Sequence, residues 1–504
     1  MLKTKSKQKR LKKSTLKEKT AQGLLWGGVS NILQQCIGMG FGIVIARILT
    51  PDDYGLIAML AIFSAIAVAF IDGGFSYVLI KKKNLQHRDC NAVFWFSALM
   101  GLGIYLLLFF AAPLIAKFYK QPELLSLSRL LFLGFLVGCI GNVHVAIMLK
   151  NMMTKQIGII NIFAVLSSGI AGLLMAVNGY AYWGLVVQQL AHIVIAVFLR
   201  WYFSPWRPTF QFDFSPLRNM IGFSLKLFLT NIIVNVNTNL SYTLMGKFYG
   251  KTSLGYYSQG YKWVSTGSLL ISGMLNMVTA PLASQVNDDA ERQLRVVRKM
   301  LRFTAFVAFP VFMGLVIIAK DFIGITLGDK WLPSIPFMQI ICIWGLCSTF
   351  ITLFVHFLLI NDRSSTYLYG NLIFCSIQML VLLLVYCLGA GIIYFAAGFV
   401  ATSACSAVFW YIKVQPILKI KNRQAFVDVF PYFTVSGFSA LAAWLATNRI
   451  DAAWLSILLK IILMPSCYFA VLRLFNSVML KETVEMLKNQ IKPPGNTAPT
   501  DKNQ

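Results

Sequence analysis

The chain has 504 residues, of which 57% are hydrophobic and 12% charged, and its mean hydropathy is +0.68. This composition excludes a soluble globular protein, because that class carries about twice as much charge. The net charge of +27 would suit a nucleic-acid-binding protein, yet the chain has neither zinc-finger spacing nor an aromatic RNA-binding signature. The basic residues lie in short segments between apolar stretches, which is typical of a membrane protein and predicts no nucleic-acid partner.

The first 20 residues contain nine Lys or Arg and one acidic residue, Glu18. A signal peptide begins in this way, but the apolar run that follows is too long and has no small-residue cleavage site. We therefore predict a basic cytosolic tail followed by an uncleaved first transmembrane span.

About fourteen apolar stretches, most of them 20 to 30 residues long, follow this tail. A bilayer core ~30 Å thick is crossed by a helix of ~20 apolar residues. The sequence thus predicts an all-α integral membrane protein with about 14 transmembrane helices. The expected spans are 21–48, 55–79, 92–115, 126–149, 156–177, 181–203, 219–246, 255–282, 303–327, 332–360, 364–388, 391–412, 426–447 and 452–474.

The distribution of Lys and Arg between the two sides orients these spans. With both termini in the cytosol, 33 Lys and Arg fall on the cytosolic side and 9 on the external side. Basic residues are retained on the cytosolic side of a membrane, so we expect both termini there. Residues 285–301 and the stretch after the last span are expected to form amphipathic helices on the cytosolic surface.

A weak internal repeat appears when the sequence is shifted by 200 residues. Three pairs illustrate the shift: Asn31 and Asn231, Arg47 and Lys247, and Gly55 and Gly255. Six spans per repeat is an even number, so the two lobes share one orientation. Parallel repeats of this kind bind substrate between the lobes and alternate access by rocking.

The repeat predicts two pseudo-symmetric six-helix lobes and two accessory helices. The expected parts are a basic tail (1–20), an N-lobe (21–203), a cytosolic linker (204–218), a C-lobe (219–412), accessory helices (413–474) and an amphipathic, disordered tail (475–504).

Amide side chains form one face of the first span, at Asn31, Gln34 and Gln35. The seventh span repeats this pattern with Asn231 and Asn235. Matching polar faces on repeat-related helices would line a hydrated cavity. Packing between helices is the alternative, because amides and small residues also join membrane helices.

Charged residues inside spans are costly to bury, so they indicate function. Lys262 lies near the middle of the eighth span, where it would either bind an anion or pair with a buried carboxylate. Lys226 is close to a cytosolic end and could extend to the surface. Arg47 and Lys247 mark the external rim and either end their spans or contact substrate. Lys460, on an accessory helix, is expected to be structural.

Asp52 and Asp53 form an acidic pair in the first external loop. Polytopic glycosyltransferases use such a pair as base and metal ligand. The alternative is a polar turn in which Thr50, Pro51 and Asp52 begin the next helix. The nine cysteines include no C-x-x-C pair, so we expect neither a metal site nor a cofactor.

Several segments resemble the polysaccharide-transport family of the MOP flippase superfamily, in its Wzx-type, colanic-acid-exporter-like branch. They are Trp26-Gly27-Gly28, "ARILTPDDYGLIAM" (46–59), "DGGFSYVLIKKK" (72–83), "APLIAKFYKQPEL" (112–124) and "LGYYSQGYKW" (254–263).

The resemblance implies a multi-pass flippase of the bacterial cytoplasmic (inner) membrane, which is a transporter and not an enzyme. Its substrate would be an undecaprenyl-diphosphate-linked oligosaccharide, moved to the periplasmic leaflet for O-antigen, capsule or exopolysaccharide assembly. Membrane lipids and the polymerase and ligase of polysaccharide synthesis are the implied partners.

Two rival functions remain open at this point. A MATE-like cation-coupled drug exporter has the same fold, but it would call for an acidic residue in the first lobe, and the first span has none. A polytopic glycosyltransferase using a lipid-linked sugar would need the acidic pair of the first external loop.

Overall fold

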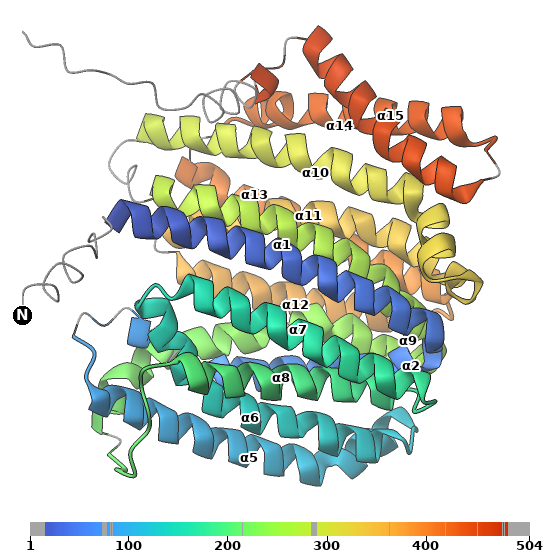
Figure 1. The fold of residues 1–504 in the computed structure, drawn as a ribbon. Helices are drawn as coiled ribbons and strands as arrows, with labels where there is room; N and C mark the ends of the chain where they lie inside the picture. The colour runs from blue at the N-terminus through green and yellow to red at the C-terminus, as the bar shows by residue number, and fades with distance from the viewer. Residues whose placement is uncertain are drawn as a thin grey trace, which may run out of the picture. The chain divides into compact units, whose positions relative to one another are not determined.

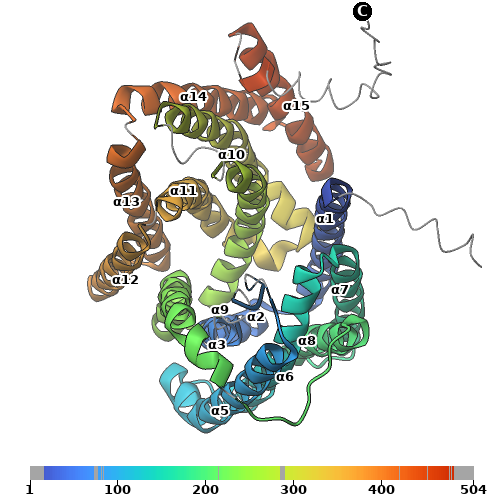
Figure 2. The same ribbon diagram turned by 90° about the vertical axis from the view of Figure 1, so that its left-hand side faces the viewer.

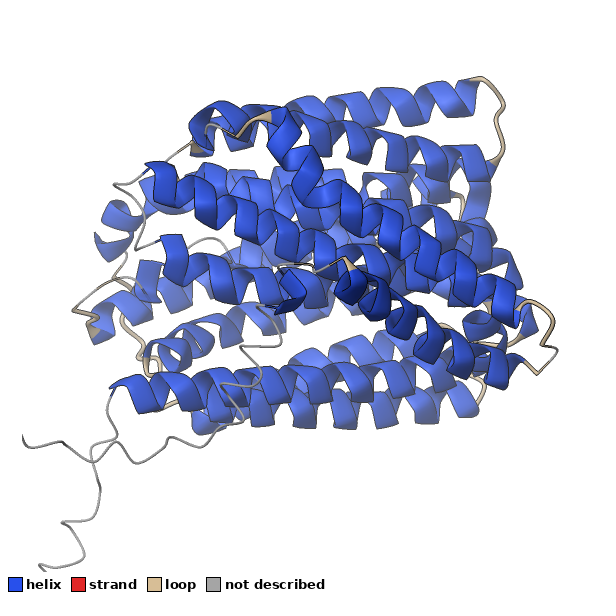
Figure 3. Ribbon diagram, turned by 90° about the horizontal axis from the view of Figure 1, so that it is seen from above, coloured by secondary structure: helices blue, strands red, loops and turns tan. Residues whose placement is uncertain are grey.

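The computed structural model describes most of the chain. The described residues are 16–72, 78–80, 82, 84–213, 215–283, 290–361, 363–418, 420–450, 452–475, 477 and 479–481. Within them every regular element is a helix (Figure 3). The predictions for most of the basic tail, for the C-terminal tail beyond 481 and for the Lys226 side chain lie outside this part.

Figure 1 shows the helices coloured in chain order. In chain order they are α1 (Leu16–Ile48), α2 (Pro51–Met59), α3 (Ala61–Asp72), α5 (His87–Tyr119), α6 (Leu124–Lys150), α7 (Thr154–Val177), α8 (Trp183–Phe203), η2 (Ser215–Leu217), α9 (Arg218–Ala283), α10 (Ala290–Thr326), η3 (Asp329–Ser334), α11 (Ile335–Ile360), α12 (Ser364–Cys387), α13 (Ile392–Leu418), α14 (Asn422–Thr447) and α15 (Ala453–Leu474).

The number of spans agrees with the prediction. In the described part of the chain, 11 helices are long and apolar enough to cross a membrane, or 12 if the bent pair α2 and α3 is one span. The 66-residue helix α9 covers the two remaining predicted spans. It is interrupted at Gly250, whose φ of 81° lies in the left-handed region that favours glycine. The all-α, multi-pass membrane fold is therefore confirmed.

Two helices depart from their predicted form. The span expected at 55–79 consists of α2 and α3, which are bent by 41° around Leu60. Residues 290–301 were expected to form a separate surface helix, and this was wrong for the described residues. They continue directly into the span as the first turns of α10, because no helix-breaking residue separates them from Phe303.

The chain divides into two compact units. The first comprises Met1–Ser258 with Asn371–Phe395, and the second comprises Gln259–Gly370 with Ala396–Gln504. This division falls inside α9, not at residues 204–218, and the lobe boundaries expected from the repeat stay a prediction.

In the first unit, α1 and α5 to α8 form a packed set of helices. Helix α6 contacts α5 and α8, α8 contacts α7, and α7 contacts α1 (Figure 1). Small residues permit the close approach of α1 and α7. A Cβ on Gly158 would meet the Ser30 side chain at 2.7 Å, so this position favours glycine.

The linker after α8 (204–213) is held against the first turns of α5 by hydrogen bonds. The Asn91 amide donates to the Gln211 carbonyl oxygen (2.6 Å) and accepts from the Thr209 backbone N–H (2.9 Å). The Arg88 guanidinium donates to Asp213, and this hydrogen bond lowers the pKa of the Asp213 carboxyl to about 2. The linker is thus held by side chains from the first turns of α5.

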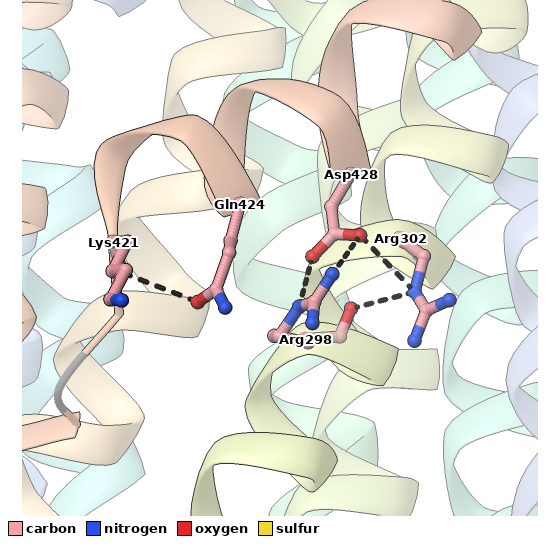
Figure 4. A network of polar contacts seen from close by, with 5 residues as sticks. All are labelled: Arg298, Arg302, Lys421, Gln424 and Asp428. Carbon is pink, nitrogen blue, oxygen red and sulfur yellow. Dashed lines mark hydrogen bonds and ion pairs between the residues drawn. The ribbon is translucent and has the colours of Figure 1, made fainter.

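In the second unit, α10 contacts α11, α14 and α15, and α14 contacts α15 (Figure 2). The Asp428 carboxylate at the beginning of α14 accepts two hydrogen bonds from the Arg298 guanidinium, at 2.7 and 3.1 Å (Figure 4). Arg302 Nε lies 3.7 Å from Asp428 Oδ1, which also accepts from Arg298. Only 4% of the Asp428 side chain is exposed, so this ion-pair cluster joins the ends of α10 and α14.

A second ion pair joins α10 to α15 inside the apolar region. Lys460 Nζ lies 2.6 Å from Asp321 Oδ2, and Ser456 Oγ donates to the same oxygen at 2.7 Å. The Lys460 side chain is 7% exposed. This contact supports the structural role predicted for Lys460.

We expect Lys460→Met to destabilise the protein strongly. It would leave the Asp321 carboxylate buried without its partner, which costs about 3–5 kcal/mol. The double variant Lys460→Met/Asp321→Leu removes both charges and should recover most of that loss. Thermal unfolding of the purified protein checks this, and a single variant as stable as the wild type would contradict it.

Candidate transport site

The amides predicted on the first span lie on the accessible part of α1. Asn31 is exposed, and Gln34 and Gln35 are partly exposed. The neighbouring Gly38 is not a tight packing position, because its Cβ would meet only Val165 Cγ1, at 4.0 Å. The same side of α1 contacts α7 at Ser30 and Phe41, which lie against Gly158 and Gly169, so the lining of a cavity by these amides stays a prediction.

On the corresponding face of α9, several polar side chains form hydrogen bonds with backbone carbonyl oxygens of the same helix. Asn235 Nδ2 donates to the Asn231 carbonyl oxygen at 2.9 Å, and Thr238 Oγ1 donates to that of Val234 at 2.8 Å. Such bonds to the preceding turn satisfy part of the polarity within one helix. The Asn231 side chain itself is exposed and Asn235 is partly exposed, so both remain accessible.

Further along α9, four polar residues share a helical face: Gln259, Lys262, Trp263 and Thr266. Gln259 is 1% exposed, and neither atom of its amide has a hydrogen-bond partner among the described residues. The Trp263 indole N–H is equally without a described partner. Buried polar groups in this condition cost about 1–3 kcal/mol each, which indicates a position for water or ligand.

Lys262 is half-buried on this face, and its ammonium lies 5.6 Å from the centre of the Trp263 ring. Within the described residues no carboxylate lies within ion-pair distance of it. The alternative of a buried carboxylate partner thus has no support in this part of the chain. An ammonium held in an apolar span without a counter-charge is suited to bind an anion.

The two rim cations have different surroundings. The Lys247 ammonium donates to the Phe118 carbonyl oxygen and lies 4.3 Å from the centre of the Phe118 ring. These contacts favour a structural role for Lys247 at the end of α5. Arg47 is exposed in the last turn of α1.

The beginning of α2 crosses α9 immediately after its break, with no side chain between the two backbones. A Cβ on Gly55 would overlap the Lys251 carbonyl oxygen, and a Cβ on Gly255 would overlap that of Pro51. The two contacts are related by the 200-residue shift, as is the 2.5 Å hydrogen bond from Thr252 Oγ1 to Asp52. The crossing therefore supports the repeat alignment and fixes both positions as glycine.

The acidic pair, Asp52 and Asp53, lies in the first turn of α2. Thr50 caps α2, its backbone N–H donates to Asp53 Oδ2 at 2.8 Å, and Pro51 is the first residue of the helix. Such a capping box stabilises a helix start. The interpretation of 50–53 as a helix-initiating turn is confirmed.

The predicted site residues fall into both units. The first unit contains Asn31, Gln34, Gln35, Asn231, Asn235, Arg47 and Lys247, and the second contains Lys262. The sequence interpretation did not include Gln259 or Trp263. The sequence spacing places both residues close to Lys262 on a helix. Gln259, however, lies among other polar residues in "YYSQGYKW", so nothing in the sequence distinguished it as a site residue.

The fold is that of a known class of membrane transporters. The structure is similar to the lipid II flippase MurJ in an inward closed conformation, with a TM-score of 0.69 and 13% identity over 89% of this chain and 99% of MurJ. It is also similar to an inward-facing multidrug resistance MATE family transporter of the MOP superfamily. That TM-score is 0.62, with 12% identity over 77% of this chain and 94% of the transporter. At these identities the similarity shows the fold alone.

The sequence itself identifies the family. The chain is 24% identical over 429 residues to the lipopolysaccharide biosynthesis protein WzxC of Escherichia coli (strain K12), which covers 84% of this chain and 86% of WzxC. Residues 44–336, more than half of the chain, match the polysaccharide biosynthesis protein family. The chain belongs to this family, and the resemblance found in the sequence is confirmed.

Proposed function

We propose that this protein is a flippase for undecaprenyl-diphosphate-linked oligosaccharides in the bacterial cytoplasmic membrane. The family match over 44–336 carries this proposal. It is supported by WzxC, a lipopolysaccharide biosynthesis protein, and by the fold shared with MurJ, a lipid II flippase. The product would serve O-antigen, capsule or exopolysaccharide synthesis, with a polymerase and a ligase acting after it.

The polar groups of the spans provide suitable chemistry for such a substrate. A diphosphate requires a cation, and Lys262 lies in a span with no described counter-charge. Sugars require amides and aromatic rings, which Gln259 and Trp263 supply beside it and Asn31, Gln34 and Gln35 supply on α1. The proposed set is completed by Lys226, Arg47, Asn231 and Asn235, whereas the contacts of Lys247 with Phe118 favour a structural role for that residue.

The glycine crossing suggests how the external side closes. In the proposed orientation, with both termini in the cytosol, Gly55 and Gly255 lie at the external ends of α2 and the second half of α9. Their backbones meet there without side chains. A substrate leaving toward the periplasm would require this contact to separate, as alternating access between parallel repeats demands. The membrane potential assists outward movement of an anion by ~2.3 kcal/mol per charge at 100 mV.

The rival functions have less support. A cation-coupled exporter needs an accessible acidic residue in the first lobe, and α1 has none from Trp26 to Ile48. A glycosyltransferase needs a free acidic pair, but Asp53 accepts from Thr50 and Asp52 accepts from Thr252. We therefore propose a transporter without enzymatic activity.

Reconstituted vesicles test the function directly. Purified protein is placed in vesicles that contain a lipid-linked oligosaccharide, and an impermeant glycosidase or lectin reports which leaflet holds the glycan. Protein-dependent movement between leaflets, with the glycan unchanged, is expected. Transfer of the sugar to another acceptor would instead support an enzyme, and cation-driven drug uptake would support an exporter.

We expect Asn31→Leu and Asn231→Leu each to lower this transport several-fold if both helices line the substrate path. Each change replaces an accessible amide by an apolar side chain of similar size, so the loss of a hydrogen bond worth about 1 kcal/mol dominates. Ile32→Leu on the exposed surface of α1 is the matched control. If both amide variants transport at the wild-type rate, Asn31 and Asn231 do not line the substrate path, and packing between helices is their role.

A further inference from the structure

Helices α10 and α15 of the second unit enclose an apolar groove of about 490 Å³. Helix α10 contributes side chains between Phe306 and Ile318, and α15 contributes side chains between Lys460 and Phe469. Except for Lys460 and the Tyr468 hydroxyl, the lining side chains are apolar. The Tyr468 hydroxyl donates to the Phe306 carbonyl oxygen at 2.9 Å and is therefore satisfied within the protein.

The length of the groove corresponds to one leaflet of a bilayer. At a rise of 1.5 Å per residue, the lining segments of α15 and α10 extend about 14 and 18 Å. Half of a hydrocarbon core ~30 Å thick is about 15 Å. The groove therefore accommodates an acyl chain of one leaflet, whereas a polyprenyl chain is several times longer.

One end of the groove carries less positive charge than the other. Lys460 lies there, but its ammonium is neutralised by Asp321 at 2.6 Å, and Ser456 donates to the same carboxylate. Lys320, exposed on α10 two residues after Ile318, adds one cation beyond the lining at this end.

The other end is cationic. Arg473, exposed and without an ion pair among the described residues, follows Phe469 by one helical turn on α15. Arg302 precedes Phe306 by one turn on α10, and together with Arg298 it shares the single carboxylate of Asp428 (Figure 4). Among the described residues, two guanidiniums against one carboxylate leave a positive charge beside the groove.

We propose that this groove binds one anionic glycerophospholipid, with an acyl chain along α10 and α15 and the phosphate near Arg473 and Arg302. The apolar length and the charge at one end match the two parts of such a lipid. In the proposed orientation the cationic end lies at the cytosolic leaflet, whose anionic lipids attract basic side chains. The bound lipid would fasten α15 to α10 and is distinct from the transported substrate.

Native mass spectrometry of the delipidated, full-length protein tests this site. The protein is offered equal amounts of phosphatidylglycerol and phosphatidylcholine with the same acyl chains. We expect one phosphatidylglycerol to be retained preferentially, and Arg473→Gln to reduce that preference about two- to fivefold, because an ion pair of an exposed side chain is weaker than a buried one. Arg423→Gln, an exposed basic residue in the first turn of α14, is the matched control and should retain the preference.

A second variant fills the groove without removing charge. Gly314 lines it, and a Cβ there would meet only Met464, at 3.5 Å or more, so Gly314→Leu would place its side chain in the groove. We expect this variant to keep its thermal stability without lipid and to lose lipid retention. Equal retention of both phospholipids by the wild type, equal losses in Arg473→Gln and Arg423→Gln, or displacement by an equal amount of undecaprenyl phosphate would each overturn the proposal.

Discussion

Gly255→Val and Gly55→Val are each expected to abolish glycan export while leaving the protein inserted in the membrane. Either side chain would overlap a carbonyl oxygen of the opposite backbone, Pro51 for Gly255 and Lys251 for Gly55. The closed form of the crossing would then be inaccessible. A destabilisation of this form by only ~1.4 kcal/mol changes its population tenfold, and the overlap should cost more. Surface glycan in a strain that carries only the variant measures the effect.

Gly103→Val is the matched control, because no described atom lies within 4 Å of the position of its Cβ. A disulfide across the same crossing tests opening instead of closing. Asp52→Cys with Thr252→Cys replaces two side chains that are 2.5 Å apart, and oxidation should block export until a reductant is added. Full export by Gly255→Val, or by the oxidised double variant, would show that transport does not require the contact between α2 and α9 to close and open.

Lys262→Ala is expected to lower export about 10- to 100-fold, because a hydrogen bond to a charged group is worth ~1.5–3 kcal/mol. The protein should remain as stable as the wild type, since no described carboxylate loses its partner. Lys262→Arg preserves the charge and should retain part of the activity. The amount of lipid-linked glycan left on the cytosolic leaflet measures the loss.

The control for this variant is Lys413→Ala, which removes an exposed lysine of α13. Its ammonium lies 5.4 Å from the centre of the Phe409 ring and has no ion pair among the described residues. Both variants change the net charge of the protein equally. Equal export by Lys262→Ala and the wild type would exclude Lys262 from the substrate path. A fall in stability in place of a fall in export would instead show a structural role.

The transmembrane helices were predictable because length and hydropathy are set by the bilayer itself. The turn before α2 was also predictable, since Thr50, Pro51 and Asp53 are local signals of a helix start. The break in α9 at Gly250 falls between the two spans expected there. The 200-residue shift correctly paired Gly55 with Gly255, which occupy equivalent places in the crossing.

Contacts between distant helices were not predictable from one sequence. Asp321 lies beside Lys320 near the end of a span and gave no sign of being paired, yet it joins Lys460 across 139 residues. The Asp428 cluster likewise joins residues that are 130 positions apart. For the same reason Lys262 could be recognised as unusual by its depth in a span, while the unsatisfied Gln259 amide one turn away became visible only in the fold.

The most direct test of flipping is the leaflet on which lipid-linked glycan accumulates in cells that lack this protein. Intact cells and spheroplasts are treated with an impermeant glycosidase, and the undecaprenyl-diphosphate glycan that resists it is measured. We predict that complete glycan units accumulate on the cytosolic leaflet and that the wild-type chain, but not Lys262→Ala, relieves this accumulation. Complete units already exposed on the external leaflet, or units that lack a sugar, would contradict a flippase.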